Sequence, residues 1–310
     1  MKIKGYLYTI SFHEDETDLC ELEMRSLFPE DSISPTGFIE SKLELEQSRS
    51  PFMKGRVDIL AESESYHELL SVISEIGLKE ASYKVVFIKG NGSIPFPDRK
   101  RMEREAGAYI EGAVDLQNPE QTFAVMFANG RWLFGYYHKS KSVWLEHQNK
   151  PNQYSTALST RLARAVANIA VPHPAGIKAI DPCCGIGTVL IEALSMGINI
   201  VGSDINPLVT GKARENIAHF HLKGEVLLQD IKAVKGAFDV AVIDMPYNLC
   251  SVLPYEEKLE MLKSARRFAK KAVIVSIEEV DEAIQQAGFA IVDRCTANKG
   301  SFKRHVLVCK

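Results

Sequence analysis

From Ser155 onward the sequence alternates between short apolar runs and segments with helical spacing, and this alternation restricts the fold more than any other feature. Strands that alternate with helices are typical of a parallel, doubly wound α/β sheet with helices on both faces. Two final strands, near 289–294 and 303–309, have no helix between them and are expected to pair antiparallel. The other expected elements are helices at 156–169, 187–195, 207–220, 255–269 and 280–286, and strands at 177–180, 198–205, 225–231, 238–244 and 272–277.

The N-terminal half has a different pattern, which we interpret as an α+β region. Met1–Phe12 is expected to form a first strand rather than a signal peptide, because no small-residue cleavage site follows it. A polar stretch that includes Pro151 is typical of a linker. We therefore expect a first unit at 1–60, a second at 61–146, a linker at 147–155 and the α/β domain at 156–310. Strands are predicted at 56–60, 83–89, 122–127 and 132–137, and helices at 66–76 and 99–112, the latter capped by Asp98.

Composition and charge narrow the class of protein. Residues 1–83 hold 8 basic and 17 acidic side chains, whereas 84–310 hold 29 and 23, so only the second segment attracts polyanions, and weakly. None of the six cysteines forms a Cys-x-x-Cys pair, which argues against a zinc site and favours a reducing, cytoplasmic setting. No apolar run approaches the roughly 18 residues that a membrane helix needs.

A glycine-rich turn lies between the first strand and the next helix of the α/β domain, with the sequence Asp181-Pro182-Cys183-Cys184-Gly185-Ile186-Gly187-Thr188. Glycines let the backbone turn sharply, and a helix N-terminus offers N–H groups to a carboxylate or phosphate. One alternative is a purely structural turn. Another is a dinucleotide site, but there a third glycine is expected where Leu190 stands. Asp181 disfavours a pyrophosphate and suits the ammonium group of a methionine moiety.

Two further acidic residues end the next two strands. Asp204 follows Gly187 by 17 residues, where a carboxylate can accept both ribose hydroxyls of an adenosine. Its alternative role is an N-cap for the helix that begins at Pro207, a role that Asn206 can also fill. Asp230 can accept the amino group of adenine, or can be a solvated loop carboxylate.

The fourth strand ends in Asp244-Met245-Pro246-Tyr247. An exocyclic amine conjugated to a ring is a poor nucleophile, and Asp244 together with the carbonyl of Pro246 can accept its two N–H bonds. Tyr247 can stack on a base that has left its helix. The alternative is an ordinary Pro-Tyr turn. Four such signals at the ends of successive strands are more informative than any one, because ligands bind at this edge of doubly wound sheets.

These motifs, together with Ser155–Ala165 (STALSTRLARA), resemble the THUMP-domain-linked guanosine-N2 tRNA methyltransferases, which modify guanosine 10 or 6. Val114–Glu120 resembles the end of a THUMP domain. The resemblance implies a Rossmann-like class I methyltransferase with a mostly parallel seven-stranded sheet, preceded by a ferredoxin-like unit at 1–60 and a THUMP-like RNA-binding domain at 61–146. Met245 departs from the family, which usually has proline there.

The resemblance also implies a site. The cofactor is S-adenosylmethionine, with Asp244, Pro246 and Tyr247 holding the guanine and no metal. The implied partners are tRNA or another structured RNA and, in some relatives, a small activator subunit. The implied cofactor-binding residues are Thr156, Asp181, Cys183, Gly185, Gly187, Thr188, Asp204, Ile205, Asp230 and Ile231. Arg99, Lys100, Arg101 and Arg104 are RNA-facing candidates; alternatively they form a solvated helix face paired with Glu103 and Glu105.

Three other functions remain open from the sequence. A methyltransferase with the same chemistry can act on rRNA guanine, on DNA adenine or on a protein amide, and the THUMP-like region argues against the last two. A non-catalytic RNA-binding or assembly factor can use the same fold and tolerate Met245. A nicotinamide oxidoreductase is disfavoured by the missing third glycine and by the terminal strand pair.

Overall fold

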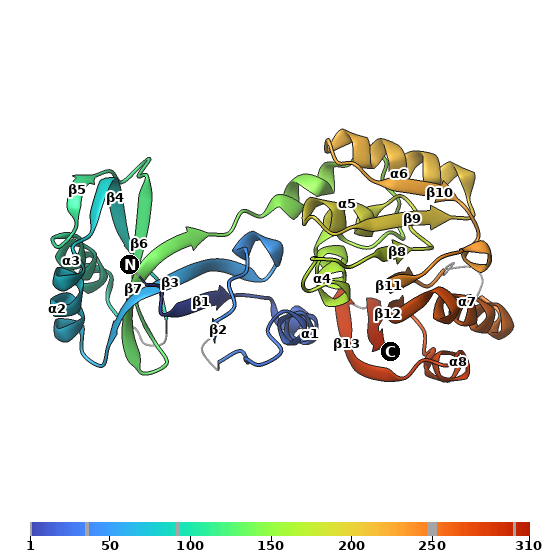
Figure 1. Ribbon diagram of the computed structural model, residues 1–310, viewed down its shortest axis with the longest axis horizontal. Coiled ribbons are helices and arrows are strands. Elements are labelled where there is room, and N and C mark those ends of the chain that lie inside the picture. The colour runs from blue at the N-terminus through green and yellow to red at the C-terminus, as the bar shows by residue number, and fades with distance from the viewer. Residues whose placement is uncertain (1, 35–36, 91–93, 247–252, 300–301) are drawn as a thin grey trace. The chain divides into compact units, whose positions relative to one another are not determined.

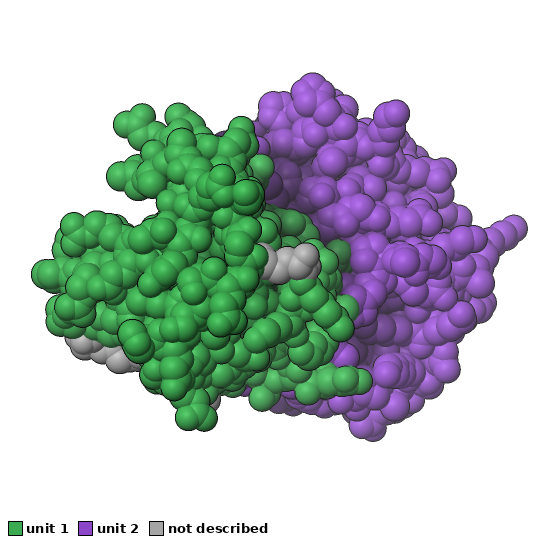
Figure 2. Space-filling view, turned by 60° about the vertical axis from the view of Figure 1, so that its left-hand side comes forward, with its two compact units in different colours: residues 1–11, 30–141 green, residues 12–29, 142–310 purple. Residues whose placement is uncertain are grey.

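The computed structural model describes residues 2–34, 37–90, 94–246, 253–299 and 302–310. The chain forms two compact units (Figure 2). Unit 1 comprises residues 1–11 and 30–141, and unit 2 comprises residues 12–29 and 142–310. No helix among the described residues is long and apolar enough to cross a membrane.

The described residues of unit 1 form one seven-stranded sheet with the order β2-β1-β3-β7-β6-β4-β5 (Figure 1). Alternating side chains give it two apolar faces: Phe123 and Phe134 belong to the core on the side of the helices, and Val57 and Met126 to the core on the other side. The strands are β1 (Gly5–Ile10), β2 (Phe38–Ser41), β3 (Met53–Ser63), β4 (Lys79–Phe87), β5 (Glu111–Val114), β6 (Gln121–Ala128) and β7 (Arg131–Lys139), and the helices are α2 (Tyr66–Ile76) and α3 (Phe96–Gly107).

Two boundaries differ from the sequence-based ones. The division expected between residues 60 and 61 falls inside β3, which pairs with both β1 and β7, so the sheet is continuous across it. The helix expected at 99–112 begins at Phe96, with Pro97 and Asp98 in its first turn, and ends at Gly107. It ends there because Tyr83 donates its hydroxyl to the Gly107 carbonyl at 2.7 Å and the chain then forms β5 beside β4.

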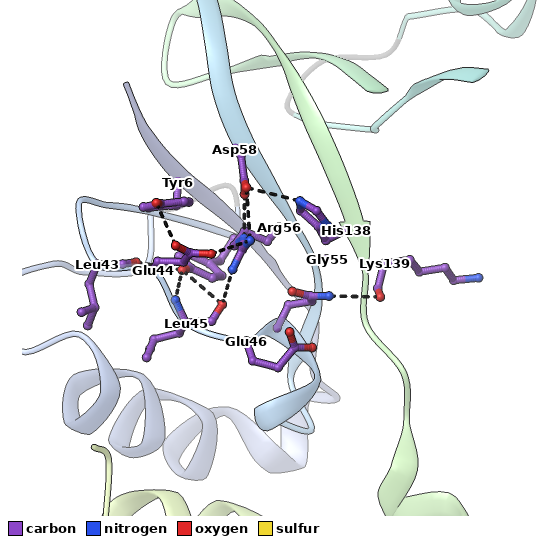
Figure 3. Close-up of polar contacts among 12 residues, drawn as sticks. Tyr6, Leu43, Glu44, Leu45, Glu46, Gly55, Arg56, Asp58, His138 and Lys139 are labelled. Carbon is purple, nitrogen blue, oxygen red and sulfur yellow. Dashed lines mark hydrogen bonds and ion pairs between the residues drawn. The ribbon is translucent and has the colours of Figure 1, made fainter. Parts of the chain in front are cut away.

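A buried polar cluster fixes the segment after β2 onto this sheet (Figure 3). The guanidinium of Arg56 donates to both carboxylate oxygens of Asp58, at 2.6 and 3.1 Å, and to the carbonyl of Leu45 at 2.9 Å. Glu44 and His138 complete the cluster, at 3.0 Å from Arg56 and 3.2 Å from Asp58. Because Arg56 and Asp58 are both buried, their mutual pairing is what makes their burial tolerable.

Unit 2 contains the predicted doubly wound sheet. In the described residues its order is β10-β9-β8-β11-β12-β14-β13, and only β14 runs antiparallel to its neighbours. The parallel sheet and the antiparallel final pair expected from the sequence are therefore confirmed. The strands are β8 (Ala179–Asp181), β9 (Ile200–Asp204), β10 (Glu225–Leu228), β11 (Phe238–Asp244), β12 (Ala269–Ser276), β13 (Ile291–Lys299) and β14 (Phe302–Cys309).

Helices cover the sheet of unit 2 (Figure 1). α4 (Thr160–Ala170) packs on β11 and β12 and against α5 (Thr188–Ser195), which contacts α6 (Pro207–His219). α7 (Tyr255–Phe268) packs on β12 and against α8 (Asp281–Gln286), and these two helices share a core with β11 and β12.

Helix α4 is shorter than expected. It was predicted from residue 156 but begins at Thr160, because the Ser159 hydroxyl caps it by accepting from the N–H of Leu162 at 3.3 Å. Residues 156–158 therefore stay outside the helix.

An N-terminal helix also belongs to unit 2, although the sequence-based division placed all of residues 1–60 in a separate first unit. α1 (Thr17–Leu27) contacts α4 and β13. Its fully buried Glu23 accepts a hydrogen bond from the Asn168 amide at 2.6 Å, and Arg25 makes two hydrogen bonds to Asp293. The chain thus passes from β1 in unit 1 through α1 in unit 2 and back to β2.

Candidate active site

A cavity of about 480 Å³ lies at the carboxyl edge of the unit 2 sheet. Its walls come from the ends of β8, β9 and β11, from the segment after β10, and from the segment before α4. All of the predicted cofactor-binding residues line it except Gly187, and so do Asp244 and Pro246. The remaining lining residues are Tyr154, Ala157, Leu158, Pro182, Cys184, Ile186, Val189, Asn206, Val209, Lys232, Met245, Leu253, Glu257 and Met261.

The glycine-rich turn has the left-handed backbone that its sequence predicts. Gly185 and Gly187 have φ angles of 52° and 82°, and Gly187 is the N-cap of α5. Gly187 has a packing role, since a Cβ there would come within 3.2 Å of Ala213 on α6. Leu190 stands against Gly202 of β9, whose added Cβ would meet it at 2.3 Å. The glycine that lets α5 approach β9 is therefore Gly202 on the strand. In a dinucleotide site it is the third glycine of the turn, at the position of Leu190.

Asp204 connects two of the strand ends. Its carboxylate accepts from the N–H of Gly185 at 2.9 Å and from the N–H of Asn206 at 2.9 Å. The N-cap of α6 is Asn206 rather than Asp204, because the Asn206 side chain accepts from the N–H of Leu208. A carboxylate has about four acceptor positions, so two remain for a ligand with paired hydroxyls.

Acidic side chains cluster at the cavity. Asp181 is 2% exposed, and burial together with the nearby carboxylates of Asp244 and Asp204 raises its pKa well above the usual value. Burial also raises the pKa of Asp244 to about 7, against an opposing effect of Arg304. A cationic ligand would stabilise the ionised forms of these two carboxyls, whereas an anionic pyrophosphate would destabilise them further.

The opening of α5 has an unused hydrogen-bonding group. The Thr188 hydroxyl is buried, and it has no hydrogen-bond partner within the described part of the chain. It lines the cavity at a helix N-terminus, where N–H groups favour a carboxylate. A ligand with adjacent ammonium and carboxylate groups, such as a methionine moiety, therefore fits Asp181 and Thr188.

Asp230 caps a single 3-10 turn (Ile231–Ala233), accepting from the N–H of Lys232 at 2.9 Å. It lines the cavity beside Ile231, Lys232 and, from α7, Met261. The Asp230 carboxylate beside the apolar side chains of Ile231 and Met261 is suited to an adenine ring with its amino group.

The Asp244-Met245-Pro246 segment continues the end of β11. Met245 is buried, and its N–H donates to the carbonyl of Val275 at 2.8 Å. A proline at this position, as the family usually has, lacks that N–H, so Met245 is a departure that adds a hydrogen bond. Tyr247 lies outside the described residues.

Three polar residues that the sequence did not single out organise the site. Arg304 on β14 is buried and donates to the Thr156 carbonyl at 3.2 Å. Asn216 on α6 donates to the carbonyls of Ile186 and Asn152, at 3.0 and 3.1 Å, and accepts from the N–H of Asn152. The glycine-rich turn and the segment that leads to Thr156 are thus tied to one side chain.

The third, Glu192 on α5, anchors the segment expected to be a linker. It is fully buried and lies 2.8 Å from both His147 Nδ1 and Arg164 Nη1. His147 belongs to a 3-10 segment (Val143–Asn149), which packs on α4 and α5. Residues 147–155 are therefore part of unit 2.

The RNA-facing candidates on α3 make contacts within their own helix. Lys100 pairs with Glu103 at 2.6 Å, and Arg101 lies 3.2 Å from Asp98 and 3.6 Å from Glu105. The guanidinium of Arg99 lies over the ring of Phe96. In the part of the chain that the structure describes, no group of three or more His, Cys, Asp or Glu side chains is arranged to hold a metal ion.

Comparison with known proteins agrees with this geometry. Residues 148–287 match the UPF0020 family model, described as an RMKL-like methyltransferase domain. The chain is 32% identical over 185 residues to the tRNA (guanine(10)-N2)-dimethyltransferase of Methanothermobacter thermautotrophicus, with 54% of each protein covered. It is 24% identical over 213 residues to the Pyrococcus abyssi enzyme of the same name, covering 63% of this chain and 64% of that one.

The chain therefore spans about half to two thirds of the length of these relatives. The crystal structure of TrmN from Thermus thermophilus resembles the whole fold, with a TM-score of 0.51, 19% identity and 99% of each chain covered. These matches support the resemblance to the guanosine-N2 tRNA methyltransferases and the methyltransferase domain, for which the sequence predicts S-adenosylmethionine as cofactor, and the likeness to TrmN shows the fold.

Proposed function

We propose that this chain, whose residues 148–287 match a family model described as an RMKL-like methyltransferase domain, methylates the exocyclic N2 amine of a guanosine in tRNA. The observation that carries the proposal is the cavity itself. Acidic side chains from the ends of successive strands converge on it, and two of them, Asp181 and Asp244, are carboxyls with raised pKa values whose ionised forms a cationic ligand would stabilise.

S-adenosylmethionine has the charge and shape that this cavity favours, and when bound it supplies the electrophilic methyl group. Asp181 and Thr188 receive its amino-acid end, Asp204 accepts the ribose hydroxyls with its two remaining acceptor positions, and Asp230 accepts the adenine amino group. The other cofactor contacts in the proposal are Thr156, Cys183, Gly185, Ile205 and Ile231, which also line the cavity, while Gly187 shapes the turn.

Asp244 and Pro246 act on the substrate. The Asp244 carboxylate and the Pro246 carbonyl accept the two N–H bonds of the guanine amine, which withdraws the nitrogen lone pair from the ring and aims it at the methyl group. Most of the rate gain then comes from positioning. Tyr247 is assigned the stacking role from the sequence alone.

The proposal extends to the rest of the chain. Unit 1 takes the role of the RNA-docking region, including a THUMP-like part, with α3 as one contact surface. Guanosine 10 is the first candidate position, because the relatives at 32% and 24% identity are named for it, and guanosine 6 is the second. A small activator subunit and a cytoplasmic site of action belong to the same proposal.

The test is transfer of labelled methyl from S-adenosylmethionine to unmodified tRNA, with and without an activator subunit, followed by nucleoside analysis. Labelled N2-methylguanosine supports the proposal, and fragment mapping then gives the position. Label in rRNA alone redirects the substrate assignment. Cofactor binding with no transfer to any RNA identifies a non-catalytic binder.

A further inference from the structure

Arg304 stands at the carboxyl edge of the sheet although it comes from the last strand. β14 pairs antiparallel with β12, where His305 is opposite Ser276 and Val306 is opposite Val275. Val275 is in turn opposite Asp244 on β11. Arg304 on β14 and Asp244 on β11 therefore lie at the same edge of the sheet, on opposite sides of β12.

The Arg304 side chain connects two parts of the cavity wall. It is only 7% exposed, and its Nη2 donates to the carbonyl of Thr156 at 3.2 Å. Its positive charge also acts on Asp244, whose pKa it lowers against the effect of burial. Thr156 and Asp244 both line the cavity, one from the segment before α4 and the other from β11.

The titratable groups of other elements that sense the Asp244 carboxylate are Asp181 at the end of β8 and Cys183 in the glycine-rich turn, and the charge of Asp244 raises the pKa of both. A guanidinium stays protonated at every relevant pH, so Arg304 is a constant source of positive potential. With the Asp244 pKa near 7, the charge of this carboxylate at neutral pH depends on such a source.

We propose that Arg304 is a positioning residue for methyl transfer, which keeps Asp244 ionised and holds the Thr156 backbone against the cofactor site. The inference rests on the proposed function. It deepens that function, because only an ionised Asp244 has the full acceptor capacity that the guanine amine needs. Arg304 does not itself touch the substrate.

Two variants test the two effects. Arg304→Lys keeps a positive charge on a long side chain, whereas Arg304→Gln removes the charge, and its shorter side chain also withdraws the donor from the Thr156 carbonyl. Lys303→Gln is the matched control, because Lys303 is the exposed neighbour on the same strand. Each variant is assayed for single-turnover methyl transfer across pH 5.5–9, and for cofactor affinity by calorimetry.

The acidic limb of the rate profile is expected near pH 7 for the wild type and for Lys303→Gln. In Arg304→Gln it should move upward by about one unit, so that the rate at pH 6 falls about tenfold, and cofactor affinity should fall as well because the Thr156 carbonyl loses its donor. Arg304→Lys should keep the limb of the wild type and most of its cofactor affinity.

Coincident profiles for the wild type and a folded Arg304→Gln would overturn the inference about charge. A folded Arg304→Gln variant with unchanged cofactor affinity would overturn the inference about Thr156. If Arg304→Gln does not fold, a shifted limb in Arg304→Lys would equally contradict the proposal. Failure of the proposed function looks different, because the wild type then transfers no methyl group at any pH.

Discussion

The carboxylate of Asp204 accepts a hydrogen bond from the backbone N–H of Gly185 at 2.9 Å, so the end of β9 holds the glycine-rich turn that follows β8. The same side chain is the proposed acceptor for the ribose hydroxyls. Asp204 therefore shapes the pocket before any ligand enters, and its removal should affect cofactor binding in two ways.

Asp204→Ala should weaken S-adenosylmethionine binding by at least a hundredfold, because it removes the hydroxyl acceptors and frees the Gly185 N–H. Hydrogen bonds to charged groups contribute about 1.5–3 kcal/mol each. Asp204→Asn, which keeps one acceptor oxygen, should bind with intermediate affinity. Calorimetric titration measures both, and equal affinity of Asp204→Ala and the wild type would refute the assignment.

Asp244→Asn should make the unliganded protein more stable at high pH. The folded-state pKa of Asp244, about 7, lies above its ordinary value of 3.8, so the folded protein binds more protons and the stability of the wild type falls as pH rises between about 4 and 7. Asparagine carries no charge and avoids this loss. The difference at pH 8 has an upper limit of roughly 4 kcal/mol, from about 1.4 kcal/mol per pKa unit.

Urea denaturation at pH 5 and pH 8 measures this difference. The stability advantage of Asp244→Asn should grow from pH 5 to pH 8. Asp239→Asn is the control, since the pKa of Asp239 is lowered by hydrogen bonds, so its loss should not stabilise the protein at pH 8. An advantage that is the same at both pH values would show that Asp244 titrates normally.

Asn216→Ala should reduce cofactor affinity although Asn216 does not line the cavity. The side chain holds Ile186 in the glycine-rich turn and Asn152 near Thr156, and its loss leaves two carbonyls without their donor. A decrease of about tenfold is expected, at about 1 kcal/mol per lost hydrogen bond with partial compensation by water. Lys212→Ala, an exposed position on the same helix, serves as the control and should bind as the wild type does.

Glu192→Gln should destabilise unit 2 by about 3 kcal/mol. Removing one partner of a buried ion pair leaves the other charge without full compensation, which typically costs about 3–5 kcal/mol. Here the carboxylate serves both Arg164 and His147. Urea denaturation followed by circular dichroism tests this, with exposed Glu256→Gln for comparison. A loss below about 1 kcal/mol would mean that the cluster is not an anchor.

The sequence predicted which strand ends meet at one edge of the sheet better than it predicted the domain boundaries. Asp181, Asp204, Asp230 and Asp244 each follow a short apolar strand, and the parallel topology alone brings the ends of β8 to β11 together at one edge. This rule depends only on the order of strands and helices, so local patterns are sufficient.

Other features depend on contacts between distant parts of the chain. Arg304, Asn216 and Glu192 are single polar residues in apolar or mixed segments, and no spacing distinguishes them from surface residues. Helix α1 looks like any acidic amphipathic helix, and its contacts with distant residues of α4 and β13, Glu23 with Asn168 and Arg25 with Asp293, place it in unit 2. The boundary set at residue 60 failed because β3 is long and its neighbours β1 and β7 come from both predicted units.

The most direct test of the account compares wild type and Asp244→Ala in methyl transfer to unmodified tRNA, with cofactor and RNA binding measured in parallel. The account predicts labelled N2-methylguanosine with the wild type, and no label with Asp244→Ala, which should still bind RNA and S-adenosylmethionine. Undiminished transfer by Asp244→Ala would contradict the assigned site, and a wild type that binds the cofactor but labels no RNA would contradict the assigned reaction.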